Sequence, residues 1–269
     1  MARRRISEEP TSRLAVWARR LAVFAIVVAA LAIVVLRTGF VEVGPGLATF
    51  AAALVIAAIA LLLAIAAFVV IWREGVNGFG YAFLALGIAV ALLAYPAYLA
   101  ISTYHLPALA DITTDPADPP RFEAIARVRP REANPVAYRA ESSGARQRLA
   151  FPDIEPLELA VTPVQAYNAA LTVLSKHRWS VVEARAPLAG RRDGNIEAVA
   201  RTPIMGFRDD VAVRVRAIPN GARIDIRSAS RYGARDFGTN AARVRSLSEE
   251  IEEAAGEQPE SRPQPAARR

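Results

Sequence analysis

The fold is decided by a long apolar stretch, residues 14–103, which opens at Leu14 with LAVWARRLAVFAIVVAALAIVVLR. It contains three apolar runs, separated by short segments that carry Arg, Glu and Gly: about 14–36, 47–72 and 79–103. A helix needs about 20 apolar residues to cross the hydrocarbon core of a bilayer. The first run has a shorter charge-free core at 21–36, which flanking Arg side chains can extend by reaching to the interface. We therefore expect an N-terminal anchor of three transmembrane helices, preceded by a tail at 1–13.

A cleaved signal peptide is the alternative interpretation of the first run, because a basic start and an apolar segment are both present. Cleavage needs small residues at the end of the apolar segment, followed by polar sequence. The run ends instead in VVLR at Val34–Arg37. We expect this helix to be retained.

The distribution of arginine predicts how the anchor is oriented. The tail, the start of the first run and the loop at 73–78 hold seven Arg, whereas the loop at 37–46 and the 20 residues after Thr103 hold two. Cytoplasmic segments are enriched in Arg and Lys, so we expect a cytoplasmic N-terminus and an exported C-terminal domain. Abundant Ala, with Lys176 as the only Lys, is typical of GC-rich coding. We accordingly expect a bacterial inner membrane and a periplasmic domain.

The apolar runs contain almost no groups that could carry ions or protons. No Asp, Glu, Lys, Arg or His occurs at 21–36, 47–72 or 79–103. Transport pathways and proton relays usually need such side chains inside the membrane. The pattern favours an anchor that contacts membrane lipid over a pore or a pump.

The rest of the chain predicts one soluble domain at 104–256 and a disordered tail at 257–269, which is rich in Pro, Gln and Arg. Residues 105–156 contain repeated X-Pro pairs, which disfavour helix. We expect this segment to form an ordered, extended collar that packs Phe122 and Phe151 on the domain. A disordered linker is the alternative.

From residue 157 on, alternation and capping signals predict the order β-α-β-β-β-β-α. Thr162 is an N-cap residue followed by Pro163, which suits the first helical position. This order predicts an α+β fold, a small antiparallel sheet with helices packed on one face. The expected strands are 157–161, 179–185, 196–201, 211–218 and 223–230. The expected helices are 163–178 and 238–255, and a basic turn is expected at 190–194.

One hairpin can be registered from its turn, because Asn220-Gly221 is a strong two-residue hairpin signal. Counting outward from this turn gives three pairs: Arg216 with Asp225, Val215 with Ile226, and Arg214 with Arg227. Like charges opposite each other destabilise a sheet. We expect an anionic group to lie between the two opposed arginines.

Composition excludes several classes of function. The net charge is +7, of which +4 lies in residues 1–103, so much of it serves to orient the anchor. With the basic domain outside the cytoplasm, nucleic-acid binding is disfavoured. There is no Cys, which excludes thiol and zinc-thiolate chemistry. We expect no metal or other cofactor, because Asp111, Asp115 and Asp118 stand beside Thr and Pro as in turns, without the spacing of a calcium loop.

Three segments resemble a known family: DITTDPADPP at 111–120, RTPIMGFRDD at 201–210 and DIRSASRYGARDFGTNAAR at 225–243. They are similar to the membrane-anchored bacterial form of the domain-of-unknown-function family numbered 1499, over about 105–253. The resemblance implies a shared fold and an envelope setting, and it implies no activity. Some relatives have Cys in the segment that corresponds to 111–120. This chain has no Cys, so Cys-based chemistry is excluded here.

The most charged stretch, residues 201–245, has ten Arg against four Asp. Its part at 228–240 runs from a strand into a helix and is rich in Ser, Arg and Gly. Hydroxyl groups, guanidinium groups and the N–H groups of a helix start are the donors that anion sites use. We predict that the domain binds an anionic ligand, a lipid headgroup or an envelope protein without catalysis. The predicted site residues are Arg214, Arg227, Ser228, Ser230, Arg231, Asn240 and Arg243.

A structural network is the first alternative for this stretch. In it, the arginines pair with the aspartates, and Asp236 caps the last helix. Asp209 and Asp210 are adjacent at the start of a strand, so their side chains are expected on opposite faces of the sheet.

Two functional alternatives remain. An envelope hydrolase would use Ser228 or Ser230 with an Asp, but the sequence has no G-x-S-x-G turn, no S-x-x-K motif and no evident His base. A partner protein or the membrane interface could instead contact the apolar turn at Ile204–Phe207. Packing of this turn into the core is the other explanation of its apolar character.

Overall fold

The structure is a computed structural model that describes residues 10–188 and 193–257. Residues 1–9 of the expected N-terminal tail, most of the expected turn at 190–194 and residues 258–269 of the expected C-terminal tail lie outside the described residues. The chain forms two compact units, one up to Tyr104 and one from His105 onward, apart from four loop residues at 203–206.

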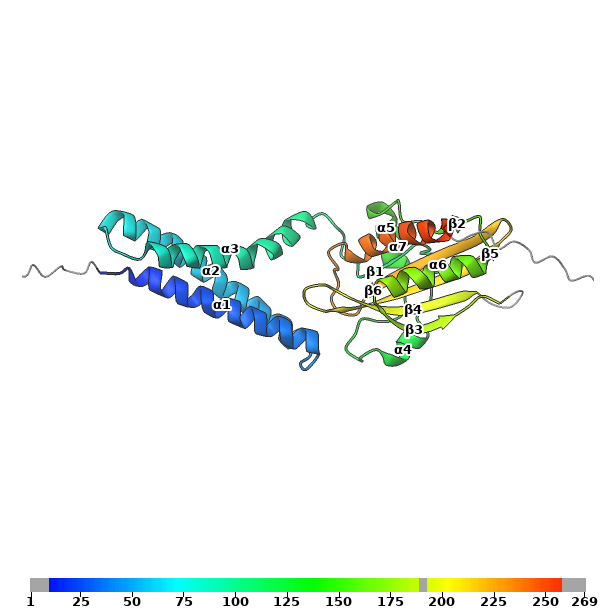
Figure 1. The fold of residues 1–269 in the computed structure, drawn as a ribbon, viewed down its shortest axis with the longest axis horizontal. Helices are drawn as coiled ribbons and strands as arrows, with labels where there is room; N and C mark the ends of the chain where they lie inside the picture. The colour runs from blue at the N-terminus through cyan, green and yellow to red at the C-terminus, as the bar shows by residue number, and fades with distance from the viewer. Residues whose placement is uncertain (1–9, 189–192, 258–269) are drawn as a thin grey trace, which may run out of the picture. The chain divides into compact units, whose positions relative to one another are not determined.

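The first unit consists of three helices: α1 (Arg13–Thr38), α2 (Val43–Glu74) and α3 (Phe79–Ser102) (Figure 1). Each is long and apolar enough to cross a membrane. The expected three helices are confirmed, and the first two extend a few residues beyond the expected bounds. The N-cap hydroxyl of Ser12 accepts a hydrogen bond from the Ala15 N–H, and α1 ends at Gly39 in the left-handed conformation.

Alanine forms the interior of this helical unit. On α1 the buried alanines recur every three or four residues, which keeps one face of the helix toward its neighbours. Small side chains let helix backbones approach closely, and this contact stabilises helix pairs where apolar burial gives little. The buried alanines are Ala15, Ala18, Ala22, Ala25, Ala29 and Ala32 of α1, Ala53, Ala57, Ala60, Ala64 and Ala67 of α2, and Ala82, Ala85 and Ala89 of α3.

Replacing Ala64 by Leu is expected to destabilise the helical unit by about 1–3 kcal/mol, because the added atoms have no space between the helices. Ala64 is fully buried. The matched control is Ala66→Leu, two positions along α2 on the exposed side. Thermal loss of helical circular dichroism in detergent would measure both variants. Equal midpoints for the two variants would contradict an interior packed by alanine.

The second unit is built on a six-stranded antiparallel sheet with the order β1-β6-β5-β4-β3, in which β2 also pairs with β6. The strands are β1 (Asp111–Thr113), β2 (Leu157–Leu159), β3 (Ser180–Arg185), β4 (Gly194–Arg201), β5 (Arg208–Ile218) and β6 (Gly221–Ser230). The helices are α4 (Ala124–Val128), α5 (Ala145–Ala150), α6 (Pro163–Lys176) and α7 (Thr239–Gly256), with one π-helical turn, η1 (Ala140–Gly144). The predicted α+β class is confirmed.

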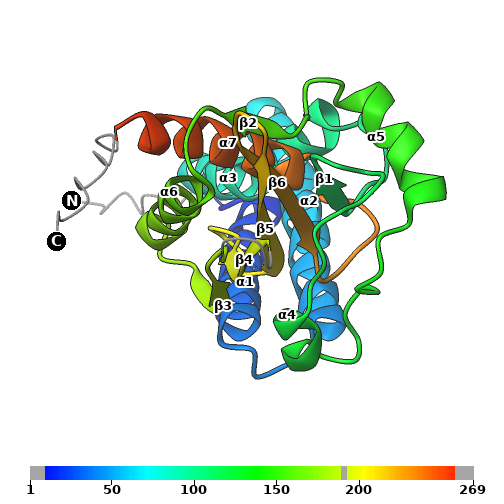
Figure 2. The same cartoon turned by 90° about the vertical axis from the view of Figure 1, so that its right-hand side faces the viewer.

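The two long helices, α6 and α7, cover one face of this sheet (Figures 1 and 2). Their buried side chains, among them Leu174 and Leu247, join Ile196, Val213 and Ile226 of the sheet in one hydrophobic core. At the start of α6, the expected capping of Thr162 is found together with a reciprocal bond from the Gln165 side chain. Local sequence signals thus account for the helices that cover this face of the sheet.

The collar covers the opposite face, which carries many Arg and Asp side chains and a small apolar cluster. Phe122 and Phe151 are buried as expected, with exposed fractions of 4% and 7%. Phe122 lies in this small cluster, whereas Phe151 packs in the core on the side of α6 and α7. The expectation of a collar without helix is wrong, since it contains α4, η1 and α5 and contributes the strand β1. Glu197 of β4, fully buried, explains α4. Its carboxylate accepts the backbone N–H groups of Glu123, Ala124 and Ile125 at 2.8–3.1 Å, which satisfies the unpaired donors at the helix start.

The β5–β6 hairpin has a different register from the one predicted. Its two-residue turn is Pro219-Asn220, and Ile218 pairs with Gly221. The predicted turn would have placed Pro219 in a ladder position that requires an N–H donor, which Pro lacks. The corrected register places two other arginines opposite each other, Arg216 and Arg223.

Candidate functional site

Three arginines of the hairpin surround one buried carboxylate. Asp225 is fully buried, and its oxygens lie 2.9 Å from Arg214, 2.7 Å from Arg216 and 2.9 Å from Arg223. The predicted opposition of Arg214 and Arg227 is wrong, but an anionic group does lie between the arginines that are opposed, Arg216 and Arg223. The protein supplies that group itself. We call this set, with Asp115 and Asp118, the hairpin cluster.

The collar completes the hairpin cluster through its aspartates. Asp115 Oδ1 accepts the backbone N–H groups of Ala117 and Asp118, which confirms the expected turn. Asp115 Oδ2 accepts from Arg223 at 2.7 Å. Asp118 accepts from Arg214 at 3.0 Å and is 57% exposed. The cluster connects the collar to the hairpin.

Arg227, on β6, is buried and makes four hydrogen bonds within the described residues. It donates to both oxygens of Asp111, at 3.0 and 2.7 Å, and to the carbonyl oxygens of Pro120 and Val136. Its guanidinium also lies 4.5 Å from the ring centroid of Phe122. These contacts connect β6 to three parts of the collar.

Asp209 and Asp210 point to opposite faces of the sheet, as expected. Asp209 accepts from Arg243 of α7 at 2.7 Å. Asp210 accepts from Arg231 at 2.8 Å and lies 3.0 Å from Arg129. Burial raises the pKa of Asp210 and lowers the pKa of Arg129. Asp210 thus faces two guanidinium groups.

The strand-to-helix segment forms a tight hydrogen-bonded group at the start of α7. The Ser228 hydroxyl donates to Asn240 Oδ1 and accepts from Arg243, and Asn240 Nδ2 donates to Ser230 Oγ. Asp236 accepts the backbone N–H groups of Gly238 and Asn240. Burial raises the pKa of Asp236. The predicted cap at Asp236 is confirmed.

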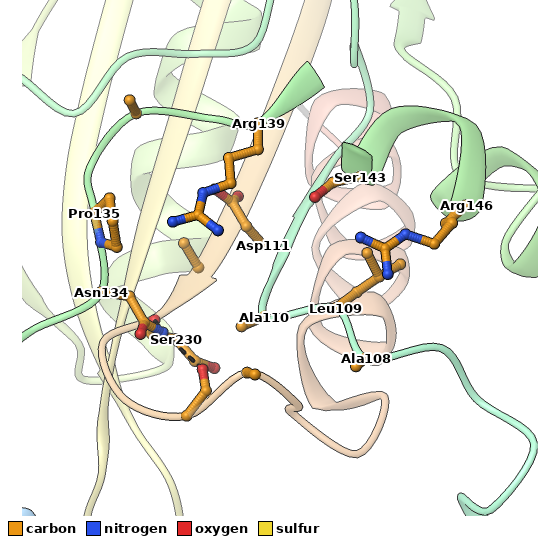
Figure 3. A pocket seen from close by; sticks show the side chains of 14 residues that line it. Ala108, Leu109, Ala110, Asp111, Asn134, Pro135, Arg139, Ser143, Arg146 and Ser230 are labelled. Carbon is orange, nitrogen blue, oxygen red and sulfur yellow. Dashed lines mark hydrogen bonds between the residues drawn. The ribbon is translucent and has the colours of Figure 1, made fainter. Parts of the chain in front are cut away.

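A pocket of about 360 Å³ opens beside this segment (Figure 3). Its floor is the start of the domain, Ala108–Asp111, together with the end of β6. One wall is the loop at 134–139, and the other comes from η1 and α5. The side chains of Arg139 and Arg146 point into the space from opposite walls, with Ser143 between them. The lining residues are Ala108, Leu109, Ala110, Asp111, Asn134, Pro135, Ala137, Arg139, Ser143, Arg146, Ala229, Ser230, Gly233 and Ala234.

Hydrogen-bonded polar side chains fix both walls of the pocket. Gln147 of α5 is buried and pairs with Thr113 of β1 through both of its amide atoms, at 2.6 and 3.1 Å. Asn134 Nδ2 donates to the carbonyl oxygens of Ser230 and Gly233. Burial, with the charge of Asp111, raises the pKa of nearby Tyr138 to about 12. The pocket walls are thus part of the packed domain.

The predicted site residues fall into separate groups. Ser230 lines the pocket. Arg227 pairs with the lining residue Asp111, and the backbone carbonyl of Arg231 accepts the N–H of the lining residue Asn134. The remaining four lie outside the pocket lining: Arg214 in the hairpin cluster, and Ser228, Asn240 and Arg243 at the start of α7.

Arg139, Ser143 and Arg146 line the pocket but are not among the residues predicted from the sequence. They lie in a segment expected to be extended, and their only local signal is basic residues around Ser142–Gly144. Within the described part of the chain, no group of three His, Asp or Glu side chains could hold a metal ion. His177 contacts Glu250 at 2.9 Å, and the Ile204 side chain is exposed at the β4–β5 turn.

The fold and the pocket define a class of protein: three apolar helices followed by an α+β domain with one six-stranded antiparallel sheet and a basic pocket. The model of a protein family of unknown function, DUF1499, matches residues 111–251, more than half of the chain. The chain belongs to this family. No curated protein and no solved structure matches it.

Proposed function

We propose that this is a membrane-anchored protein whose sheet domain binds an anionic ligand without catalysis. One observation carries the proposal. Each buried arginine has a carboxylate partner, whereas Arg139 points into the pocket with no ion-pair partner among the described residues. A guanidinium that faces a pocket of this size is suited to bind a carboxylate or a phosphate.

The predicted strand-to-helix residues support the proposal in two ways. Ser230 contributes to the pocket lining, and the ion pair between Arg227 and Asp111 neutralises a carboxylate that would otherwise repel an anion. Ser228 is fixed by Asn240 and Arg243, an arrangement that orients a hydroxyl and does not provide a base to activate it. Binding is therefore favoured over hydrolysis.

The proposed location is a bacterial inner membrane, with a cytoplasmic N-terminus and a periplasmic domain. The asymmetry of the arginines around the three helices supports this orientation. In this setting, the ligands that such a pocket meets are anionic lipid headgroups and soluble anions of the envelope. An envelope protein that contacts the exposed Ile204 turn is a second candidate partner.

The test is ligand-dependent stabilisation of the full chain in nanodiscs. A ligand at 100 times its Kd stabilises the folded state by about 2.7 kcal/mol. We expect phosphate-bearing and carboxylate-bearing probes to raise the unfolding temperature of the wild type but not of Arg139→Gln. The matched control is Arg148→Gln, an exposed arginine outside the pocket lining. If no anion stabilises the wild type beyond a neutral analogue, the proposed function is wrong.

A further inference from the structure

The ion pairs around Asp111 and Asp210 contain more arginines than carboxylates. Three buried arginines, Arg129, Arg227 and Arg231, share these two carboxylates. The electrostatic neighbours of Arg129 are these same four residues. The buried carboxylate of Glu197 lies on the same face of the sheet, but it accepts backbone N–H groups of the collar and makes no ion pair within the described residues.

Arg129 is the poorly satisfied member of this group. Its side chain is 4% exposed, and its three nitrogens make no hydrogen bond within the described part of the chain. Its Nε lies 3.0 Å from Asp210 Oδ2. A buried charge without full compensation is costly in free energy. An anion bound near Asp111 would lower this cost.

Two guanidinium groups stand on opposite sides of the pocket. Figure 3 shows the guanidinium groups of Arg139 and Arg146 directed into the pocket, with the Ser143 hydroxyl between them. Each guanidinium is suited to bind two oxygens at once. A carboxylate can also contact more than one guanidinium, as Asp225 does, but it carries one negative charge. A phosphomonoester dianion carries about two negative charges on three terminal oxygens in a tetrahedral arrangement, so it matches two guanidinium groups in both charge and geometry.

We propose that the pocket binds a phosphomonoester in its dianionic form, with the phosphate held between Arg139 and Arg146. This inference rests on the proposed function and narrows its ligand. Ser143 and Ser230 supply further donors to the phosphate. Leu109 and Pro135 line the apolar part of the pocket, where the organic part of the ester lies. The ester is either a soluble molecule or the headgroup of a lipid such as a phosphatidic acid.

The first experiment compares two phosphate esters that differ in charge. It uses the full chain in neutral nanodiscs and isothermal titration calorimetry at pH 7.5. Methyl phosphate, a dianion, is expected to bind about tenfold or more tightly than dimethyl phosphate, a monoanion. The second pKa of a phosphomonoester is near 6. Affinity for methyl phosphate is therefore expected to fall toward that of dimethyl phosphate at pH 5.5, while the affinity for dimethyl phosphate stays constant.

Variants assign the effect to the two guanidinium groups. Arg139→Gln and Arg146→Gln are each expected to weaken methyl phosphate binding about tenfold or more, and Arg148→Gln less than about twofold. Nanodiscs that contain phosphatidic acid, compared with phosphatidylglycerol, distinguish the sources. If phosphatidic acid weakens the binding of methyl phosphate and phosphatidylglycerol does not, the ligand is a lipid headgroup. If neither lipid weakens the binding of methyl phosphate, the ligand is a soluble ester.

The outcomes that overturn the inference differ from those that overturn the proposed function. Equal affinity for methyl phosphate and dimethyl phosphate, or stronger binding of succinate than of methyl phosphate, would overturn the phosphomonoester inference and leave anion binding in place. Loss of binding in Arg148→Gln equal to that in Arg139→Gln would also overturn it, since the effect would then be general surface charge. If none of these anions binds, both proposals fail.

Discussion

Replacement of Asp225 by Asn is expected to destabilise the sheet domain by about 3–5 kcal/mol. The variant keeps the size of the side chain and removes only its charge. Three guanidinium groups within 3 Å of this carboxylate would then lose their shared partner. Arg216 and Arg223, which lie directly opposite each other, would repel across the sheet.

The measurement is a urea titration of the full chain in detergent, followed by tryptophan fluorescence. With Trp17 and Trp72 replaced by Phe, only Trp179 of the sheet domain reports. The matched control is Asp118→Asn, in the same cluster. Asp118 contacts two of the same arginines but is 57% exposed, so its loss is expected to cost less than about 1 kcal/mol. If the two variants lost the same free energy of unfolding, burial of Asp225 would not be the reason for its larger effect.

Replacement of Gly221 by Ala is expected to destabilise the domain by about 3 kcal/mol, through steric overlap and backbone strain together. A Cβ atom at this position would lie 2.0 Å from the carbonyl oxygen of Leu159, where the chain leaves β2. The backbone φ angle is +150°, which residues with a side chain rarely adopt. Because the obstacle is backbone, a change of side-chain rotamer cannot relieve it.

The same urea titration measures the effect of Gly221→Ala. Gly256→Ala is the control, since it ends α7 and its added Cβ would meet no atom within 4 Å. Ala favours helix over Gly, so this control is expected to be neutral or slightly stabilising. A wild-type midpoint for Gly221→Ala would show that β2 does not pack against this turn in solution.

Local signals in the sequence were sufficient for much of the fold. The three apolar runs, the capping of α6 at Thr162 and the alternation in β4, β5 and β6 each depend on residues within one element. The predicted register of the hairpin is wrong by two residues, because the prediction placed the turn at Asn220-Gly221 and left out the effect of Pro219. Pro219 fixes its own backbone angle and has no N–H, so it takes the first turn position.

The site depended on contacts between distant residues. The arginines of β5 and β6 and the aspartates of the collar were both visible, but nothing local predicts that Arg227 pairs with Asp111 across more than 100 residues. Strand β1 has only three residues and exists because β6 offers an edge for it. The pocket combines the start of the domain, the collar and the end of β6. Such a combination has no signature in any single segment.

The pairing of β1 and β2 with β6 has a consequence for synthesis of the protein. Both early strands pair only with the last strand, within the described residues. Loop closure over such separations is slow compared with local folding. The polypeptide from β1 to β5 therefore has to be kept from aggregation until its partner strand has been synthesised. A chain that stops before residue 221 lacks β6, so β1 and β2 have no strand to pair with, and we expect this chain to stay incompletely folded and to be degraded.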